Sequence, residues 1–394
     1  MEGSVKRVLS AVGVFLAGLF VVSSSLCAAD KPADPALVRA QFQAVMSQLE
    51  PGGDILAVVN VDGLLEGMFG LVEKVISMAP EGDKDAGKIR AALPKVKSFL
   101  KRNGFFAGTC AGMSAVPKGD GYYSTSMFLA RDPAAAALPL WKGLLGGEPR
   151  TQAALGFIPR DAVVVRVLNC DPGQLWRLLK SGVNDIGGPG AGQAFSNGLS
   201  AAAMALGTSA DRLVDSIGDE MFFSIQLSRD AKIKLPGDGN SAIEIPEPSL
   251  LIGLKVRNDT VLSVIDRQIA TNKVPVTIAQ VGGTKVESME LPAPLPFPVQ
   301  PSIASHGGYL LIASSRKAME DSLSAFGQKN GLSSTPEFGG VFAGLPARNN
   351  GMAYVSPRYM QTVCDVITKV METKAAGTSK DAKAAAFMMD LMKW

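Results

Sequence analysis

One pattern occurs twice in the chain and limits its fold more than any other feature. Residues 51–78 read PGGDILAVVNVDGLLEGMFGLVEKVISM, and residues 158–183 read IPRDAVVVRVLNCDPGQLWRLLKSGV. Both segments pass from a turn through Asp into a β-branched run, then through a short polar break into apolar residues spaced three and four apart. The β-branched run favours a strand, and the spacing that follows favours an amphipathic helix. We therefore expect one α+β unit that is used more than once.

The rest of the chain fits this unit, with different insertions in each copy. We expect strand, helices, hairpin and helix in that order, and residues 352–355 open a third copy that has too few residues to finish. The near-continuous apolar run at 55–61 predicts a strand buried on both faces. The fold class expected is α+β, with tandem repeated units whose helices pack on one face of antiparallel or mixed sheets. The expected divisions are a signal peptide at 1–29, a first unit at 30–150, a second, longer unit at 151–345, and a partial, mainly helical third unit at 346–394.

The N-terminal residues have the features of an export signal. Lys6 and Arg7 precede an apolar run at 8–22, and small residues then offer a cleavage site before Asp30. An uncleaved membrane anchor is the alternative, and it would be the chain's one attachment to a membrane. A lipid anchor at Cys27 is disfavoured because the residue before it is bulky. We expect an exported protein of the periplasm or cell envelope.

Three cysteines follow the leader, at positions 110, 170 and 364. Their odd number, long spacing and lack of a C-x-x-C motif argue against a disulfide framework and against a zinc ribbon. Cys110 and Cys170 both fall in strand-like runs, so they are the pair that an oxidising compartment would join. Buried free thiols are the simpler expectation.

The composition excludes some classes of protein. Hydrophobic residues make up 47% of the chain and charged residues 19%, with a formal net charge of +3. Without a dense basic block, nucleic-acid binding has no electrostatic support. After the leader, no apolar run approaches the length that spans a bilayer.

Two motifs are candidates for catalysis. His306 is the single histidine and lies in the turn SHGG, where a surface position is expected. Ser314 and Lys317 match the S-x-x-K motif of penicillin-binding enzymes at a strand-to-helix junction, but the S-D-N and K-T-G companions are missing. Ser98 and Lys101 match the same motif inside a predicted helix, which shows how often it arises by chance. Ser314 and Ser315 are more simply residues that start a helix.

Binding motifs are equally weak. The glycine-rich GGPGAGQ at 187–193 lacks the spacing of a phosphate-binding loop and predicts a flexible interruption. Asp120 and Asp238 lie in glycine-rich turns that supply too few oxygen ligands for calcium. We therefore assign no catalytic residue, no cofactor and no metal site.

Aromatic pairs are the feature that most favours a binding function. They occur at 105–106, 122–123 and 222–223 in predicted hairpins. Neighbouring strand residues point to opposite faces, so one residue of each pair should enter the core. The other residues would form an exposed apolar stripe, which marks a binding surface.

Four segments resemble, in order, a family of exported bacterial proteins that is defined as a domain of unknown function. They read LGFIPRDAVVVRVLNCDPGQLW, LIGLKVRNDTVLSVI, GGYLLIASSRKAMEDSL and TPEFGGVFAGLPARNNGMAYVS. The resemblance covers residues 155–360, and a weaker resemblance covers residues 50–145. It implies an exported repeat protein, and because its motifs are turns and strand starts it transfers no catalytic residue.

Three functions remain open at this stage. The leading one is a non-enzymatic exported protein that acts in binding or assembly, with another envelope protein as a partner. The first alternative is a carrier of an apolar ligand such as lipid. The second alternative is a hydrolase with an unrecognised site.

Overall fold

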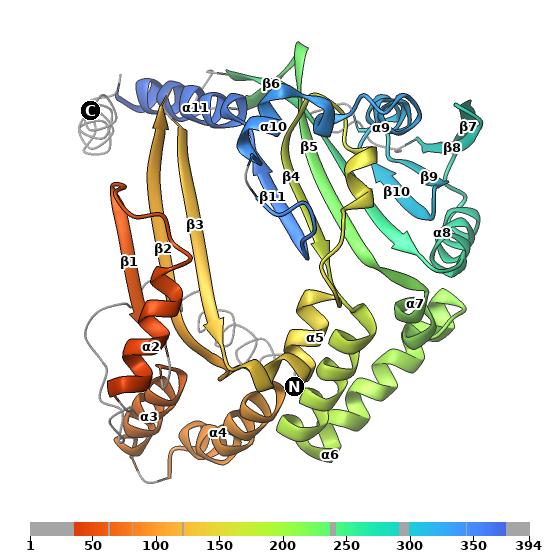
Figure 1. Cartoon of the computed structure of the whole chain (residues 1–394). Helices are drawn as coiled ribbons and strands as arrows, with labels where there is room; N and C mark the ends of the chain where they lie inside the picture. Colours follow the sequence, from red (N-terminus) through yellow and green to blue (C-terminus); the bar gives the residue numbers. More distant parts are fainter. Residues whose placement is uncertain are drawn as a thin grey trace. The chain divides into compact units, whose positions relative to one another are not determined.

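The computed structural model describes residues 35–61, 64–80, 82–119, 122–236, 242–290, 299–343 and 345–375 (Figure 1). The chain forms two compact units. Of the described residues, the first unit comprises those from Pro35 to Leu138 together with 184–188, and the second comprises 139–183 together with those from Pro189 to Ala375. The boundary expected after residue 150 falls inside the second unit.

The first unit is built on a three-stranded antiparallel sheet in the order β1-β2-β3. Helix α2 packs on one face of it, where Val45 and Leu49 contact Cys110. The elements of this unit are α2 (Pro35–Met46), β1 (Ile55–Asn60), α3 (Leu64–Ser77), α4 (Lys84–Asn103), β2 (Gly108–Gly119), β3 (Tyr122–Arg131) and the 3-10 helix η1 (Pro133–Ala137).

The other face of this small sheet is apolar and uncovered. Strand β1 was expected to be buried on both faces, and this expectation is wrong: β1 is an edge strand whose Ile55 and Val59 are exposed. On β3, Met127 and Leu129 are also exposed. The apolar run at 55–61 gave the correct element but not its burial, because a run of aliphatic residues does not reveal whether a second layer exists to cover it.

The second unit is built on an eight-stranded sheet in the order β11-β4-β5-β6-β10-β9-β8-β7, in which every neighbouring pair is antiparallel. The last strand along the sequence, β11, therefore pairs with β4, the first strand of the unit. The elements are α5 (Pro139–Leu145), η2 (Ala153–Phe157), β4 (Ala162–Asn169), α6 (Pro172–Leu206), α7 (Ala210–Ser216), β5 (Ile217–Pro236), β6 (Ala242–Val256), α8 (Thr260–Thr271), β7 (Val276–Val281), β8 (Thr284–Met289), β9 (Ser302–His306), β10 (Tyr309–Ala313), α9 (Arg316–Gln328), η3 (Leu332–Ser334), α10 (Pro336–Val341), β11 (Gly351–Val355) and α11 (Pro357–Ala375).

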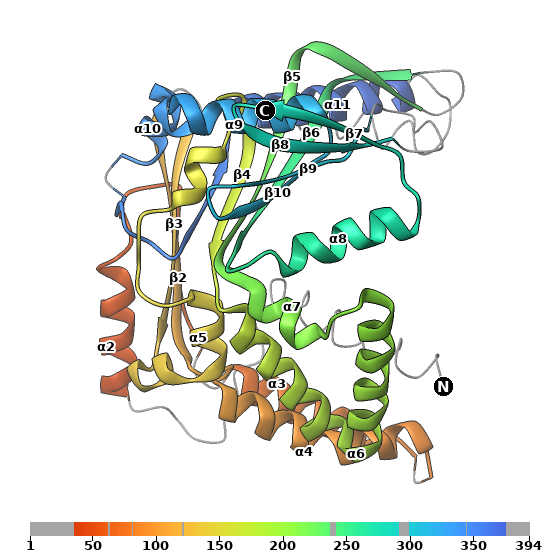
Figure 2. The same cartoon turned by 90° about the vertical axis from the view of Figure 1, so that its right-hand side faces the viewer.

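One side of this sheet, called the core face below, carries the hydrophobic core of the unit. Alternate residues of its strands point to this side, and they pack against η2, α9, η3 and α10. Phe157 of η2 lies at the centre, with its ring stacked on Phe326 at 4.3 Å between centroids and in contact with Phe222 and Tyr309. Figure 2 shows α9 and α10 on one side of the strands and α8 toward the other.

From the sequence, Asp171 and Pro172 predict a helix start and Gly282-Gly283 predicts a two-residue hairpin turn, and both predictions are confirmed. Asp171 caps α6 by accepting a hydrogen bond from the Gln174 backbone N–H, with Pro172 at the first helical position. Gly282 and Gly283, both at positive φ, form the two-residue turn between β7 and β8. The α+β class with antiparallel sheets is confirmed as well.

A tandem repeat is not shown. The order of strand, two helices and two strands occurs in both units, and β1-β2-β3 and β4-β5-β6 are each consecutive in their sheets. Beyond that order the units differ, because β5 has 20 residues where β2 has 12, and the larger sheet continues through five more strands.

The glycine-rich segment at 187–193 does interrupt the helical pattern, as expected, but the break is a kink at Gly188 between two helical segments and not a loop. It lies inside α6, where Gly188 leaves the helical conformation at φ 71° and ψ −175° and marks a kink just before Pro189. Proline is tolerated at the first position of a helix, so a new helical segment begins directly after the break.

Some expectations lie outside the described residues. These are the leader at 1–29, the part of the expected third unit beyond residue 375, and both Asp120 and Asp238. Within the described ranges, no helix has both the length and the apolarity needed to cross a bilayer.

The close packing of Phe222 on Gly253 yields a test of the core. A Cβ atom added at Gly253 of β6 would lie 2.0 Å from the Phe222 ring. We expect Gly253→Ala to destabilise the protein by about 1 to 3 kcal/mol through overpacking, measured by urea denaturation. The control is Gly327→Ala in α9, where the added Cβ meets nothing within 4 Å. It should stabilise by up to about 1 kcal/mol, and equal losses at both positions would contradict the packing described.

Candidate functional site

The side of the eight-stranded sheet opposite the core face is apolar and uncovered over four strands. Strand alternation assigns alternate residues to it from the regular segments 351–355, 164–168, 221–225 and 250–254. Each of them is exposed or half-buried, and all but Gly351 carry a side chain. We call this surface the open face, and its side chains are those of Val164, Arg166, Leu168, Met221, Phe223, Ile225, Leu250, Ile252, Leu254, Ala353 and Val355.

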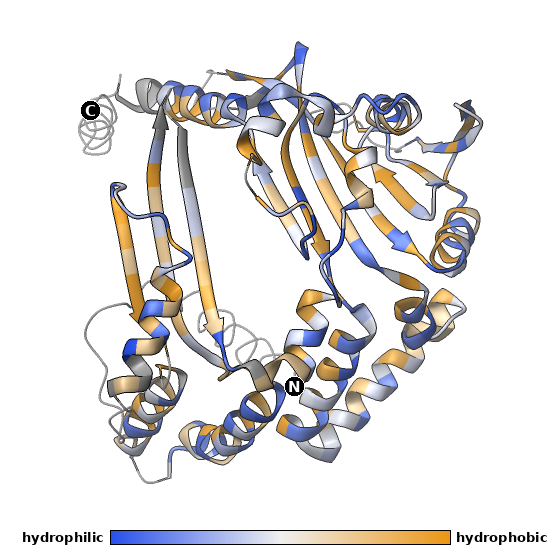
Figure 3. Cartoon of the chain, viewed as in Figure 1, coloured by the Kyte–Doolittle hydropathy of each residue, from blue (hydrophilic) through white to orange (hydrophobic). Residues whose placement is uncertain are grey.

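The strand register aligns these side chains in rows across the sheet. In the central row Ala353 pairs with Arg166, Arg166 with Phe223, and Phe223 with Ile252, which pairs in turn with Ile312 of β10. Figure 3 shows apolar residues along β4, β5 and β10. Phe223, Leu250 and Val355 are 38%, 40% and 48% exposed, values that a covered sheet face would not have.

Arg166 is the one charged side chain of the open face. It is exposed, and within the described residues no hydrogen bond or ion pair engages its guanidinium. Its neighbours in the row are Ala353 and Phe223, and Val164 and Leu168 flank it on the same strand. An unpaired cation therefore lies in apolar surroundings.

Toward β7 the same side of the sheet is covered by α8. Leu310 and Ile303, which continue the rows of the open face, are buried there. A hollow of about 470 Å³ remains between α8 and the strands β7 and β8. It is lined by Asp266, Ile269, Ala270, Lys273, Val274, Val276, Ile278, Lys285 and Glu287.

The charges in this hollow influence one another. Burial, followed by the negative charge of Glu287, raises the pKa of Asp266. The hydrogen bond that Lys285 donates to Glu287 raises the pKa of the lysine. With two acids and two bases among its lining residues, the hollow has no excess charge that would select an ionic ligand.

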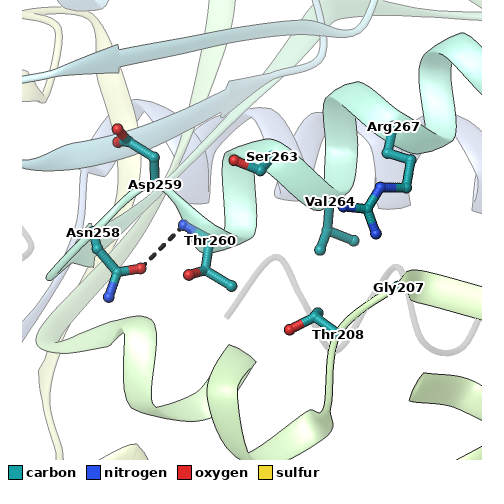
Figure 4. A pocket seen from close by; sticks show the side chains of 8 residues that line it. All are labelled: Gly207, Thr208, Asn258, Asp259, Thr260, Ser263, Val264 and Arg267. Carbon is teal, nitrogen blue, oxygen red and sulfur yellow. Dashed lines mark hydrogen bonds between the residues drawn. The ribbon is translucent and has the colours of Figure 1, made fainter. Parts of the chain in front are cut away.

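A second hollow, of about 350 Å³, lies at the N-terminus of α8 beside the connection from α6 to α7. Figure 4 shows its lining, in which Asn258 accepts a hydrogen bond from the Thr260 backbone N–H. Its cation, Arg267, donates to the Leu206 carbonyl oxygen. The polar groups shown there thus stabilise the helix start and the neighbouring chain.

At one end of the core face, charged side chains form a compact polar cluster of Arg150, Asp219, Glu220, Lys255 and Tyr309. Arg150 donates to Asp219, and the Lys255 ammonium lies 3.2 Å from the same carboxylate. Glu220 is 1% exposed, and it accepts a hydrogen bond of 2.7 Å from the Ala154 backbone N–H.

The pairing in this cluster sets its protonation. Burial raises the pKa of Asp219, but hydrogen bonds from Arg150 and Lys255 outweigh it and lower the pKa to about 2. Burial and the nearby Glu220 charge raise the pKa of Tyr309. The two cations, Arg150 and Lys255, balance the charges of Asp219 and Glu220. We therefore interpret the cluster as a structural link that connects β5, β6 and the loop at Arg150.

The residues considered for catalysis are not brought together. Ser314 accepts a hydrogen bond from the Leu250 backbone N–H, whereas Lys317 pairs with Asp321 on its own helix. Ser315 caps α9, as expected for a helix start. Lys101 of the other S-x-x-K match pairs with Glu66.

His306 differs from the expected surface turn residue. It is half-buried, its Nδ1 lies 2.7 Å from the Thr284 hydroxyl, and its ring lies nearly perpendicular to those of Phe157 and Phe326, at 6.2 and 5.0 Å between centroids. Searched over the described residues, the structure contains no group of three or more His, Cys, Asp or Glu side chains arranged to hold a metal ion.

One aromatic pair behaves as predicted. Phe222 enters the core at 2% exposure, whereas Phe223 lies on the open face.

Sequence reasoning missed Arg166, although the signal is visible as one charged residue inside the β-branched run VVVRV. A strand with only one filled face accommodates such a residue without a buried charge.

All three cysteines in the described part of the chain are free thiols. Cys110 and Cys170 are buried, and burial raises the pKa of both. The Cys110–Cys170 disulfide considered from the sequence is not present.

The polar cluster gives a prediction for acid stability. A folded-state pKa near 2 for Asp219, below the ordinary 3.8, means that its stabilisation is present above pH 4 and is lost as the pH falls toward 2. We expect Asp219→Asn to be less stable at pH 7 and to show a shallower loss of stability between pH 4 and 2, measured by urea denaturation across that range. Asp321→Asn, which removes an exposed ion pair on α9, is the control and should keep the native slope. An unchanged slope in Asp219→Asn would show that the cluster does not contribute.

The comparisons with known proteins do not assign a family. Searches of family models, of curated proteins and of solved structures found no match to this chain. A functional assignment therefore depends on the chain's own residues and their geometry.

Proposed function

We propose that the chain is a non-enzymatic binding protein that holds an apolar or amphipathic partner on the open face. In line with the export signal that the sequence predicts at 1–29, we place this activity in the periplasm or cell envelope. Membership of the exported domain-of-unknown-function family remains a prediction that fits this proposal.

The observation that carries the proposal is that helices cover one face of the eight-stranded sheet, whereas apolar side chains on the opposite face of four strands remain accessible. Four helical segments fill the core face, whereas ten apolar side chains and Arg166 remain accessible on the other. Exposed apolar surface of this extent is costly in water, and in soluble proteins it marks a site of interaction.

The polar groups support binding over catalysis. Ser314 and Lys317 have separate partners, and the acids and bases of the polar cluster neutralise one another. A hydrolase would need an unpaired nucleophile and a base that converge on one site. The open face instead offers aliphatic area with one cation, which suits association.

The second candidate, a carrier of an apolar ligand, is favoured by one specific feature. The hollow beside α8 continues the open face toward β7, and Val276 and Ile278 line it. A ligand that lies along the sheet would therefore meet a partly enclosed end.

An uncharged photoactivatable hydrocarbon carrying a diazirine tests the proposal on the full-length chain. We expect labelling of the peptides that contain Met221–Ile225 and Leu250–Leu254, mapped by mass spectrometry. The double variant Phe223→Gln, Ile252→Gln should weaken probe binding roughly three- to tenfold, as expected for the loss of about 1 kcal/mol of apolar contact.

Met204→Gln is the matched control, since Met204 of α6 is 81% exposed and lies outside the open face. It should leave both labelling and affinity unchanged. Uniform labelling of exposed apolar residues, with no concentration on β5 and β6, would overturn the proposal.

A further inference from the structure

We propose that the occupant of the open face is a long-chain fatty acid, with its carboxylate on Arg166 and its acyl chain across β5, β6 and β10. This inference deepens the proposed function and rests on it. It names the chemistry of the partner from the charge of Arg166 and the apolar character of the face.

Arg166 supplies the recognition of the acid. Within the described residues no hydrogen bond or ion pair engages its guanidinium, in contrast to Arg150, Arg229 and Arg316 of the same unit, which all pair with acids. A guanidinium presents parallel N–H donors that match the two oxygens of one carboxylate. In apolar surroundings such a pair is screened less than on an open polar surface.

The row of apolar side chains that begins beside Arg166 supplies a track along which the acyl chain lies. From Arg166 the paired residues are Phe223, Ile252 and Ile312 on three successive strands. At about 4.8 Å between strands this track is roughly 14 Å long. Beyond it Ile303 is buried, so the track ends where α8 begins to cover the sheet.

The track favours one occupant over others. Its side chains are aliphatic or aromatic and offer no hydrogen-bonding group, so a peptide lying there would leave its backbone amides unsatisfied. A linear acyl chain has no such groups, and its single acid matches the single cation. Each methylene laid on the face adds apolar contact, so affinity should rise with chain length until the track is full.

Isothermal titration of the full-length chain with oleate, methyl oleate, octanoate and phosphatidylglycerol vesicles tests the inference. We expect oleate to bind at least about tenfold more tightly than methyl oleate, which has the same chain without the charge. Octanoate should bind more weakly than oleate because it fills less of the track.

Arg166→Gln should lower the affinity for oleate about tenfold and leave the affinity for methyl oleate unchanged. Arg166→Lys should retain part of the preference for oleate over methyl oleate, because it keeps the positive charge but loses the two parallel N–H donors of the guanidinium. Arg160→Gln is the control, because Arg160 is an exposed arginine that precedes β4 and lies outside the open face. Thermal unfolding of each variant checks that it is folded.

The outcomes separate the inference from the proposed function. Equal binding of oleate and methyl oleate, or no effect of Arg166→Gln, would overturn the fatty-acid assignment while the apolar binding surface stood. Binding only to phosphatidylglycerol vesicles, and not to oleate, would overturn it in favour of a membrane surface. Absence of binding to every one of these probes, together with failed hydrocarbon labelling, would overturn both.

Discussion

The structure of the second unit depends on the packing of helical segments against the core face of its eight-stranded sheet, while four strands keep the side chains of their opposite face exposed or half-buried. Phe157 lies at the centre of this packing, stacked on Phe326 and in contact with Phe222 and Tyr309. Because strand residues alternate, each residue that fills the core face places its neighbours on the opposite side. Those neighbours are apolar as well, and the helices on the core face cannot cover them. The open face is thus a direct consequence of β-branched runs such as VVVRVL in a sheet with one complete layer.

The polar cluster has the complementary role of ending the core. Where the core face reaches Glu220 and Tyr309, apolar packing gives way to charges that are paired with one another. Removing one partner of such a group is costly, because the remaining charge loses its compensation. The cluster joins the loop at Arg150 to β5 and β6. It therefore holds the strands whose other side forms the open face, without taking part in binding.

The sequence predicted local structure well and burial poorly. The Asp171–Pro172 helix start and the Gly282–Gly283 turn follow from the conformations that those residues prefer, and both are present. The burial of β1 and the setting of His306 depend on which elements pack together, which no local pattern contains. The same limit hid the open face: Phe222–Phe223 predicted one exposed ring, but the register that brings Phe223 beside Arg166 and Ile252 arises only in the folded sheet.

The central claim is that the open face is uncovered in the folded protein, and cysteine accessibility measures this directly. In a Cys364→Ser background, which removes the one exposed native thiol of the described chain, Ile252→Cys places a thiol on the open face. Ala304→Cys places one on the core face, where the residue is buried. A water-soluble maleimide should modify Ile252→Cys readily under native conditions and Ala304→Cys only after unfolding. Equal protection of both thiols would show that another part of the chain covers the sheet and would contradict the account.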